Sequence, residues 1–180
     1  MAKKANGRVA KASETKAIYP GSFDPITLGH VDIVRRMQRI LGDVTILVST
    51  SLKKKPLFSV AERVALARDA TRGIAGVTVE SFDGLTVEYA RAQGASVIAR
   101  GLRAVSDFEY ELVMANMNKK LSPDIETLIV FASPEFYYVS SNTVKEVAMH
   151  GGSAKGLVSA RVEEALRRKF RSKKRSQSGP

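Results

Sequence analysis

The amino-acid sequence predicts an α/β fold, a single domain built on a Rossmann-like, doubly wound sheet of five parallel strands with helices on both faces. Three observations predict it. From Lys16 onward, short runs rich in β-branched residues alternate with stretches of helical periodicity. The run DVTILVST is almost continuously apolar, as in a strand buried on both faces. A length of 180 residues suits one core, and no repeat or linker interrupts the pattern.

The strands follow from the apolar and β-branched runs between polar turns. They are expected at residues 16–21, 43–50, 76–82, 95–100 and 125–132. Between the first two strands, apolar residues recur at spacings of one, three and four, which predicts a helix over 30–41. The apolar face of this helix carries Ile33, Val34, Met37, Ile40 and Leu41.

Helix boundaries follow from capping residues. A capping box formed by Ser59 and Glu62 predicts a helix that runs to about residue 74. A second box, Ser106 with Glu109, predicts the start of the helix after the fourth strand, and Gly101 is expected to mark the turn before it. The other helices are expected at 85–93, 141–150 and 160–171.

The net charge of +11 is concentrated at the two ends of the chain. Residues 1–16 and 172–180 are rich in Lys, Arg, Ser and Gly, which is typical of disordered segments. We therefore expect two disordered basic tails around a domain spanning 17–171. A nucleic-acid-binding protein is the alternative that this charge suggests, but charge alone gives non-specific attraction. No nucleic-acid partner is expected.

Composition excludes several other classes of protein. No apolar run approaches the roughly 20 residues that a membrane span needs. The N-terminal segment is basic but lacks the apolar stretch of a secretory signal. The absence of cysteine excludes disulfides and thiolate chemistry. A soluble cytoplasmic protein without a membrane partner is the simplest expectation.

Ligands of doubly wound sheets bind beyond the carboxyl ends of the strands, so the loops there hold the candidate site. The loop after the first strand, YPGSFDPITLGH, ends at a helix N-terminus, where backbone amides favour phosphate. His30 lies in the first turn of that helix and can donate a hydrogen bond to a phosphate oxygen. The alternative for a lone histidine is that it packs or caps.

This loop resembles the signature of the nucleotidyltransferase superfamily related to class I aminoacyl-tRNA synthetases. Thr27, in the TLGH form of the motif, narrows the resemblance to the phosphopantetheine adenylyltransferase family. The likeness continues through KKPLF, ARGLRAVSDFEYE and VSSNTVKE, and it covers about residues 17–170. Relatives often carry threonine where this chain has Ser22, and serine or threonine where it has Asn142.

The resemblance implies reversible, in-line adenylyl transfer from ATP to 4′-phosphopantetheine, giving dephospho-coenzyme A and pyrophosphate without a covalent intermediate. It also implies a bacterial-type homohexamer and makes feedback binding of coenzyme A plausible. Mg²⁺ is expected to arrive with ATP, because no cluster of carboxylates in the sequence suggests a metal site built by the protein.

Residue roles are carried over by motif position. His30, Lys54 and Arg103 are the implied catalytic residues, and His30 stabilises the transition state. The implied acceptor site comprises Ser22, Lys54, Leu85, Thr86 and Arg100. The implied ATP site comprises Ser22, Phe23, His30, Gly101, Leu102, Arg103, Glu111, Phe136, Tyr137, Tyr138, Val139, Ser140, Ser141 and Asn142.

Purely structural alternatives remain open for several of these residues. Ser140 and Ser141 can cap a helix as well as bind phosphate. Lys54 belongs to a run of three lysines that solvation alone explains. The apolar residues Phe108, Tyr110 and Leu112 are expected to pack or to make subunit contacts rather than to act in catalysis.

Overall fold

The computed structural model describes residues 15–50 and 55–177. Five strands form one sheet: β1 (Thr15–Gly21), β2 (Gly42–Ser49), β3 (Val77–Phe82), β4 (Val97–Leu102) and β5 (Glu126–Phe131). The helices are α1 (Leu28–Leu41), α2 (Val60–Ala70), α3 (Thr86–Ala92), α4 (Val105–Leu121), α5 (Ser141–Met149) and α6 (Ala160–Gln177). Their alternation along the chain is the predicted one.

The sheet has the strand order β3-β2-β1-β4-β5, and every pair of neighbours is parallel. The chain builds outward from β1 to β3, then returns to the other side of β1 to add β4 and β5. This reversal confirms the predicted doubly wound α/β sheet. It also creates a switch point between β1 and β4, where the loops leave in opposite directions and a ligand crevice forms.

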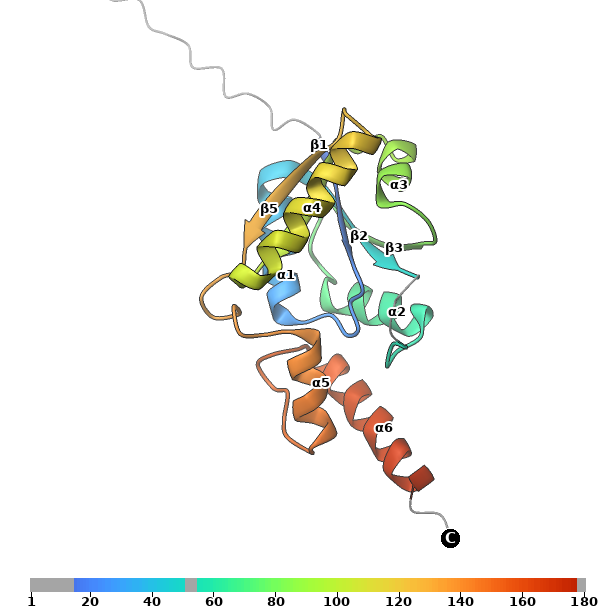
Figure 1. The fold of residues 1–180 in the computed structure, drawn as a ribbon. Coiled ribbons are helices and arrows are strands. Elements are labelled where there is room, and N and C mark those ends of the chain that lie inside the picture. The colour runs from blue at the N-terminus through green and yellow to red at the C-terminus, as the bar shows by residue number, and fades with distance from the viewer. Residues whose placement is uncertain (1–14, 51–54, 178–180) are drawn as a thin grey trace, which may run out of the picture.

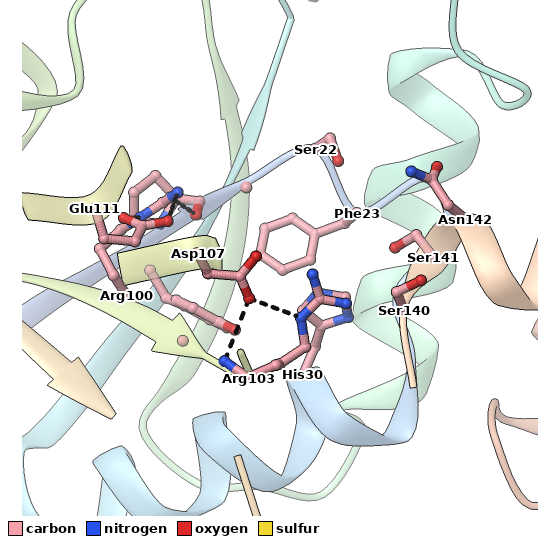
Figure 2. A pocket seen from close by; sticks show the side chains of 14 residues that line it. Ser22, Phe23, His30, Arg100, Arg103, Asp107, Glu111, Ser140, Ser141 and Asn142 are labelled. Atoms are coloured by element: carbon pink, nitrogen blue, oxygen red, sulfur yellow. Dashed lines mark hydrogen bonds and ion pairs between the residues drawn. The ribbon is translucent and has the colours of Figure 1, made fainter. Parts of the chain in front are cut away.

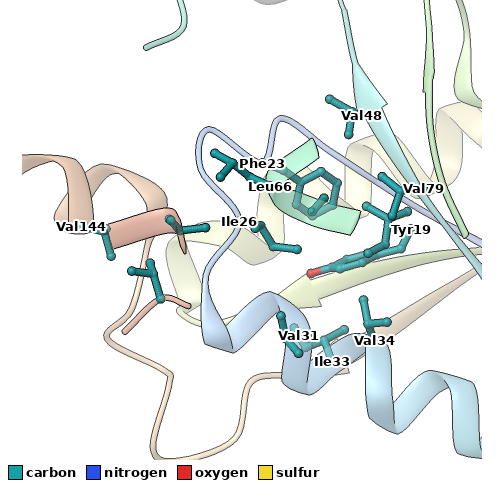
Figure 3. Close-up of a cluster of buried hydrophobic side chains, with 14 of the residues drawn as sticks. Tyr19, Phe23, Ile26, Val31, Ile33, Val34, Val48, Leu66, Val79 and Val144 are labelled. Atoms are coloured by element: carbon teal, nitrogen blue, oxygen red, sulfur yellow. The ribbon is translucent and has the colours of Figure 1, made fainter. Parts of the chain in front are cut away.

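Helices cover both faces of the sheet (Figure 1). On one face, α1 and α2 bury Val34, Met37 and Leu66 against the inner strands. Figure 3 shows Val34 and Leu66 within this cluster. On the other face, α3 packs Val87 against Ile98 and its neighbours. Helices α5 and α6 lie beyond the carboxyl ends of the strands (Figure 1). They pack against the same buried cluster as α1 and α2, through residues such as Val144 and Leu166.

Gly101 does not mark a turn. It lies within β4, which continues to Leu102. A Cβ atom on Gly101 would come within 2.7 Å of Ile33 Cδ1 and 3.1 Å of the Tyr19 hydroxyl. The glycine is therefore explained by close packing of β4 against β1 and α1, a contact between distant segments that the local sequence does not reveal.

The capping box predicted from Ser106 and Glu109 is also wrong. Helix α4 begins at Val105, and Asp107 accepts the backbone N–H of Ala104 at 3.4 Å. A carboxylate in the first turn thus accepts the amide of the residue before the helix, and Ser106 lies inside the helix rather than at its N-cap position. Elsewhere the boundaries shift by a few residues. Helix α2 ends at Ala70 rather than near residue 74.

Helix α6 continues to Gln177, so residues 172–177 are helical and do not belong to a disordered tail. Lys, Arg and Gln are good helix formers, and the helix is already nucleated by its packed first half. The remaining tail residues, 1–14 and 178–180, lie outside the described residues. Within the described residues, none of the helices combines the length and apolar character that crossing a membrane requires.

Candidate active site

A cavity of about 280 Å³ opens at the switch point, beside the carboxyl ends of β1 and β4 (Figure 2). Its walls come from four places: the end of β1 with the following loop, the first turn of α1, the β4–α4 segment, and the first turn of α5. The lining residues are Tyr19, Pro20, Gly21, Ser22, Phe23, His30, Arg100, Gly101, Arg103, Asp107, Glu111, Ser140, Ser141 and Asn142.

The loop between β1 and α1, residues 22–27, turns sharply at Phe23. This residue has φ of 45°, in the left-handed region that side chains rarely adopt. Its buried ring fits under Gly21, where a Cβ atom would come within 2.9 Å of the ring. The same ring packs edge-on against the His30 imidazole, with centroids 5.2 Å apart. The strained turn is thus held by packing, and it presents Ser22 at the cavity.

His30 is the third residue of α1 and completes a capping box with Thr27. The backbone N–H of Thr27 donates to His30 Nδ1 at 3.0 Å. Because Nδ1 accepts this bond, the proton of the neutral ring lies on Nε2. Burial, helped by the nearby Arg103 charge, lowers the pKa of His30 to about 4. The imidazole is therefore neutral at pH 7 and offers Nε2–H as a donor.

The two interpretations left open for His30 are compatible in this geometry, and phosphate binding stays a prediction. The residue does cap, through Nδ1, as the structural alternative expects. The same ring also lines the cavity, and capping uses one of its two nitrogens. Capping consequently fixes the tautomer and the ring orientation that phosphate recognition would need.

Arg100 is held rigidly at the end of β4. Its Nε and Nη2 donate to the two oxygens of Glu111 at 2.6 and 2.7 Å, and Nη1 donates to the Pro20 carbonyl at 2.7 Å. Burial lowers the pKa of Arg100, but the Glu111 carboxylate raises it by more, so the net pKa is raised and the guanidinium stays charged. A bidentate pair of this kind fixes position as well as charge.

Arg103 is held more loosely. Its Nε lies 3.4 Å from Asp107 Oδ2, and its Nη1 donates to the Val139 carbonyl at 3.4 Å. The Arg103 side chain is 38% exposed, against 25% for that of Arg100. Long contacts at partly exposed groups contribute little, so Arg103 can exchange Asp107 for an anion at low cost.

The first turn of α5 forms the opposite wall. Ser140 caps the helix, because its Oγ accepts the N–H of Thr143 at 2.9 Å. Ser141 Oγ donates to the carbonyl of Pro25 at 2.8 Å, which ties the turn to the loop after β1. With α1 on the other side, two helix N-termini border one cavity, and both dipoles favour an anion there.

The structure brings together most of the predicted site. Ten predicted residues line the cavity, and Phe136 and Val139 line a smaller one that shares His30, Gly101 and Arg103 with it. The predicted residues that line neither cavity are Leu85, Thr86, Leu102, Tyr137 and Tyr138. Lys54 lies outside the described residues.

Asp107 is the lining carboxylate that the sequence analysis missed. Its spacing of four residues from Arg103 was the available signal, since a carboxylate in the first turn of a helix can pair with a cation just before the helix. The described residues contain no group of three or more His, Asp or Glu side chains placed to hold a metal ion. The two carboxylates at the cavity, Asp107 and Glu111, both face arginines.

Comparisons with known proteins identify the family of this chain. A sequence profile of the cytidylyltransferase-like family matches residues 18–147. The chain is 59% identical to a phosphopantetheine adenylyltransferase of Bdellovibrio bacteriovorus, over 86% of this chain and 97% of that protein. It is 49% identical to the phosphopantetheine adenylyltransferase of Desulforudis audaxviator, over 86% of this chain and 94% of that protein.

Among solved structures, the Plasmodium falciparum nicotinic acid mononucleotide adenylyltransferase complexed with NaAD aligns with a TM-score of 0.64. The alignment covers 86% of this chain and 95% of the Plasmodium chain at 12% sequence identity, so the likeness concerns the fold. The sequence relatives are far closer and nearly full-length. The chain therefore belongs to the cytidylyltransferase-like family and, within it, to the phosphopantetheine adenylyltransferases.

Proposed function

We propose that this protein transfers the adenylyl group of ATP to 4′-phosphopantetheine, forming dephospho-coenzyme A and pyrophosphate. The observation that carries the proposal is the cavity at the switch point. There a neutral histidine donor, two arginines and two helix N-termini surround a space suited to phosphate groups. The names of the relatives supply the acceptor, and membership of their family supports it.

The reaction joins two anions, and their mutual repulsion is the main obstacle. An oxygen of the acceptor phosphate attacks the α-phosphorus of ATP and forms a new P–O bond. The bond from the α-phosphorus to the oxygen that bridges the α- and β-phosphates breaks, and pyrophosphate leaves with the electron pair. The attacking and leaving oxygens lie on opposite sides of the α-phosphorus, in line, and no bond to the protein is needed. Positioning and charge stabilisation therefore account for catalysis.

In this mechanism the His30 Nε2–H donates to a phosphate oxygen on which negative charge grows in the transition state. The neutral ring can do this without first taking up a proton, because its pKa of about 4 keeps it uncharged in the free protein. Ser22 and the backbone amide of Phe23 are proposed to place the reacting phosphates from the other side of the same loop.

The two arginines take different parts. Arg100 is proposed to hold the acceptor phosphate with the N–H groups that Glu111 and Pro20 leave available, from a fixed position. Arg103 is proposed to turn from Asp107 toward the ATP phosphates, as its long contacts allow. Lys54 is proposed to help hold the acceptor phosphate, and Leu85 and Thr86, at the start of α3, are proposed to contact the pantetheine arm.

The adenosine is proposed to lie against the segment from Phe136 to Asn142 and beside Leu102, with its ribose near Glu111. Mg²⁺ is proposed to enter with ATP, whose triphosphate charge it reduces when bound. The bidentate pairing of Glu111 with Arg100 supports this route, since it leaves that carboxylate engaged elsewhere. The residues at the cavity then bind and orient the phosphates, and the nucleotide carries the metal.

We also propose a homohexamer working in the cytoplasm, with coenzyme A as a feedback ligand of the same cavity. Support for an oligomer comes from α4, on which large apolar side chains stay exposed in the single chain. They include Phe108, Tyr110, Leu112, Val113 and Met117, at 49 to 62% exposure. Size-exclusion chromatography with light scattering tests this, and a monomer at micromolar concentration would overturn it.

A panel of phosphorylated acceptors tests the reaction. Purified protein with ATP and Mg²⁺ is expected to release pyrophosphate with 4′-phosphopantetheine, and not with nicotinate mononucleotide or glycerol 3-phosphate. Coenzyme A added to the active mixture is expected to inhibit competitively with 4′-phosphopantetheine. Pyrophosphate release with another acceptor instead would leave the superfamily chemistry standing and reject this substrate.

A further inference from the structure

A buried carboxylate, Asp24, lies directly behind the cavity wall. It is 4% exposed and follows Ser22 by two residues in the loop after β1. Its Oδ2 accepts the N–H of Leu57 at 2.9 Å, and its Oδ1 accepts the N–H of Phe58 at 2.9 Å. The third partner is the Lys145 ammonium, 3.0 Å from Oδ2. Three separate chain segments thus meet at one carboxylate.

Arg63 reinforces this junction from α2. Its side chain is fully buried, and it donates to the carbonyls of Ser22 and Ser49 at 2.7 and 2.8 Å. It also donates to the carbonyl of Phe58 at 3.2 Å. The loops after β1 and β2 are therefore joined by several buried hydrogen bonds, which fix their relative position independently of α5.

Helix α5 is joined to this junction differently. Among the described residues, two side-chain hydrogen bonds link α5 to the loop after β1, Ser141 to Pro25 and Lys145 to Asp24. Lys145 lies one helical turn after Ser141 and Asn142, both of which line the cavity. The ion pair therefore has Lys145 one helical turn after the cavity-lining residues of α5 and Asp24 two residues after Ser22.

We propose that Lys145 is a positioning residue for adenylyl transfer. Through Asp24 it holds the first turn of α5 against the loop after β1, so that the groups on both walls converge on the same phosphates. The inference rests on the proposed function and goes beyond it, because Lys145 does not line the cavity at the switch point. Adenylyl transfer is sensitive to such placement, since a shift of about 1 Å can cost about 100-fold in rate.

A thiol replacement offers a test within one protein preparation. The sequence contains no cysteine, so Lys145→Cys carries a single thiol. Bromoethylamine converts this thiol into an S-aminoethyl side chain that restores an ammonium at nearly the length of lysine, whereas iodoacetamide adds a neutral amide. If the thiol variant does not fold, it is alkylated in urea and then refolded.

The iodoacetamide-treated form is expected to have kcat about 10- to 100-fold below the unsubstituted protein, with KM for ATP within about threefold. The aminoethylated form is expected to recover kcat to within about fivefold. Lys169→Met is the matched control. Lys169 lies 2.8 Å from Glu62 Oε1 on α2, and with Lys145 it lines a second cavity of about 770 Å³. Its kcat is expected to stay within about twofold.

Three results would overturn the inference. Equal kcat in the two alkylated forms would show that the ammonium is irrelevant to the reaction. A recovered denaturation midpoint without recovered kcat would assign Lys145 to stability alone. A higher KM for ATP at unchanged kcat would make it a binding residue. If the unsubstituted protein forms no dephospho-coenzyme A, the proposed function fails instead, so the two failures are distinguishable.

Discussion

Replacing His30 with alanine removes the donor on which the mechanism depends. A hydrogen bond to a charged group contributes about 1.5–3 kcal/mol, which corresponds to about 10- to 150-fold in rate when it forms in the transition state. Single donors to a developing oxyanion account for about 10²- to 10³-fold in pre-organised sites. Because His30 is neutral and fixed by Thr27, we predict a fall in kcat of about 100-fold.

The dissociation constant for ATP is expected to change by less than about threefold in the same variant, because the interaction strengthens chiefly in the transition state. Pre-steady-state measurement of pyrophosphate release gives the chemical rate, and equilibrium titration gives the affinity. A variant with unchanged kcat and weakened ATP binding would refute the assignment of His30 to the transition state.

His30→Ala also leaves the buried N–H of Thr27 without its Nδ1 acceptor, at a cost of about 1–3 kcal/mol in stability. Ser59→Ala serves as the control for this effect. It removes the same kind of capping box from α2, with an expected loss of about 1 kcal/mol, away from the cavity. The control is expected to lower the denaturation midpoint and leave kcat intact. A similar loss of kcat in the control would attribute the His30 result to instability.

The remaining four predictions rest on particular contacts. An NMR titration, with the second histidine replaced, should give His30 a pKa of about 4, and a value near 6.5 would contradict the lowering of its pKa by desolvation. Since the unfolded chain binds that proton from about pH 6.5 downward, stability should fall as pH drops toward 4, by up to about 3 kcal/mol in urea denaturation. Arg100→Lys should cost about 3–5 kcal/mol in the same assay by leaving buried Glu111 poorly paired, and a loss below about 1 kcal/mol would contradict the bidentate pair. Gly101→Ala should cost about 1–3 kcal/mol through its clash with Ile33 Cδ1, and adding Ile33→Val should restore most of it; no restoration would locate the strain elsewhere.

The fold was predictable because local patterns and long-range topology agree in this chain. Continuous apolar runs marked the buried strands, and the helical spacing around Met37 marked a face that is buried at Ile33, Val34 and Met37 but exposed at Ile40. Of the predictions that failed, one did so because two local interpretations competed and one because a contact between distant segments decided the outcome. Ser106 and Glu109 matched a capping box, yet Asp107 is the residue that caps. Gly101 suited a turn, but a glycine is needed there because Ile33 on α1, 68 positions earlier in the sequence, leaves no room for a Cβ atom.

Most of the site could be predicted because its motifs sit in loops that parallel topology brings to one edge. The pairing of charged residues within the site could not be predicted. Arg100 and Glu111 were each assigned to a ligand, and their bidentate contact depends on how α4 crosses the end of β4. The ion pair of Asp24 and Lys145 joins residues 121 apart, and no local pattern announces it. Contacts of this kind arise from tertiary packing.

The most direct test of the account is product identification by ³¹P NMR in a mixture of the protein, ATP, Mg²⁺ and 4′-phosphopantetheine. The account predicts that the diphosphate resonances of dephospho-coenzyme A and the resonance of pyrophosphate grow together, one molecule of each per turnover. Growth of AMP with pyrophosphate, or loss of ATP without the diphosphate product, would contradict transfer between two phosphates held in this cavity.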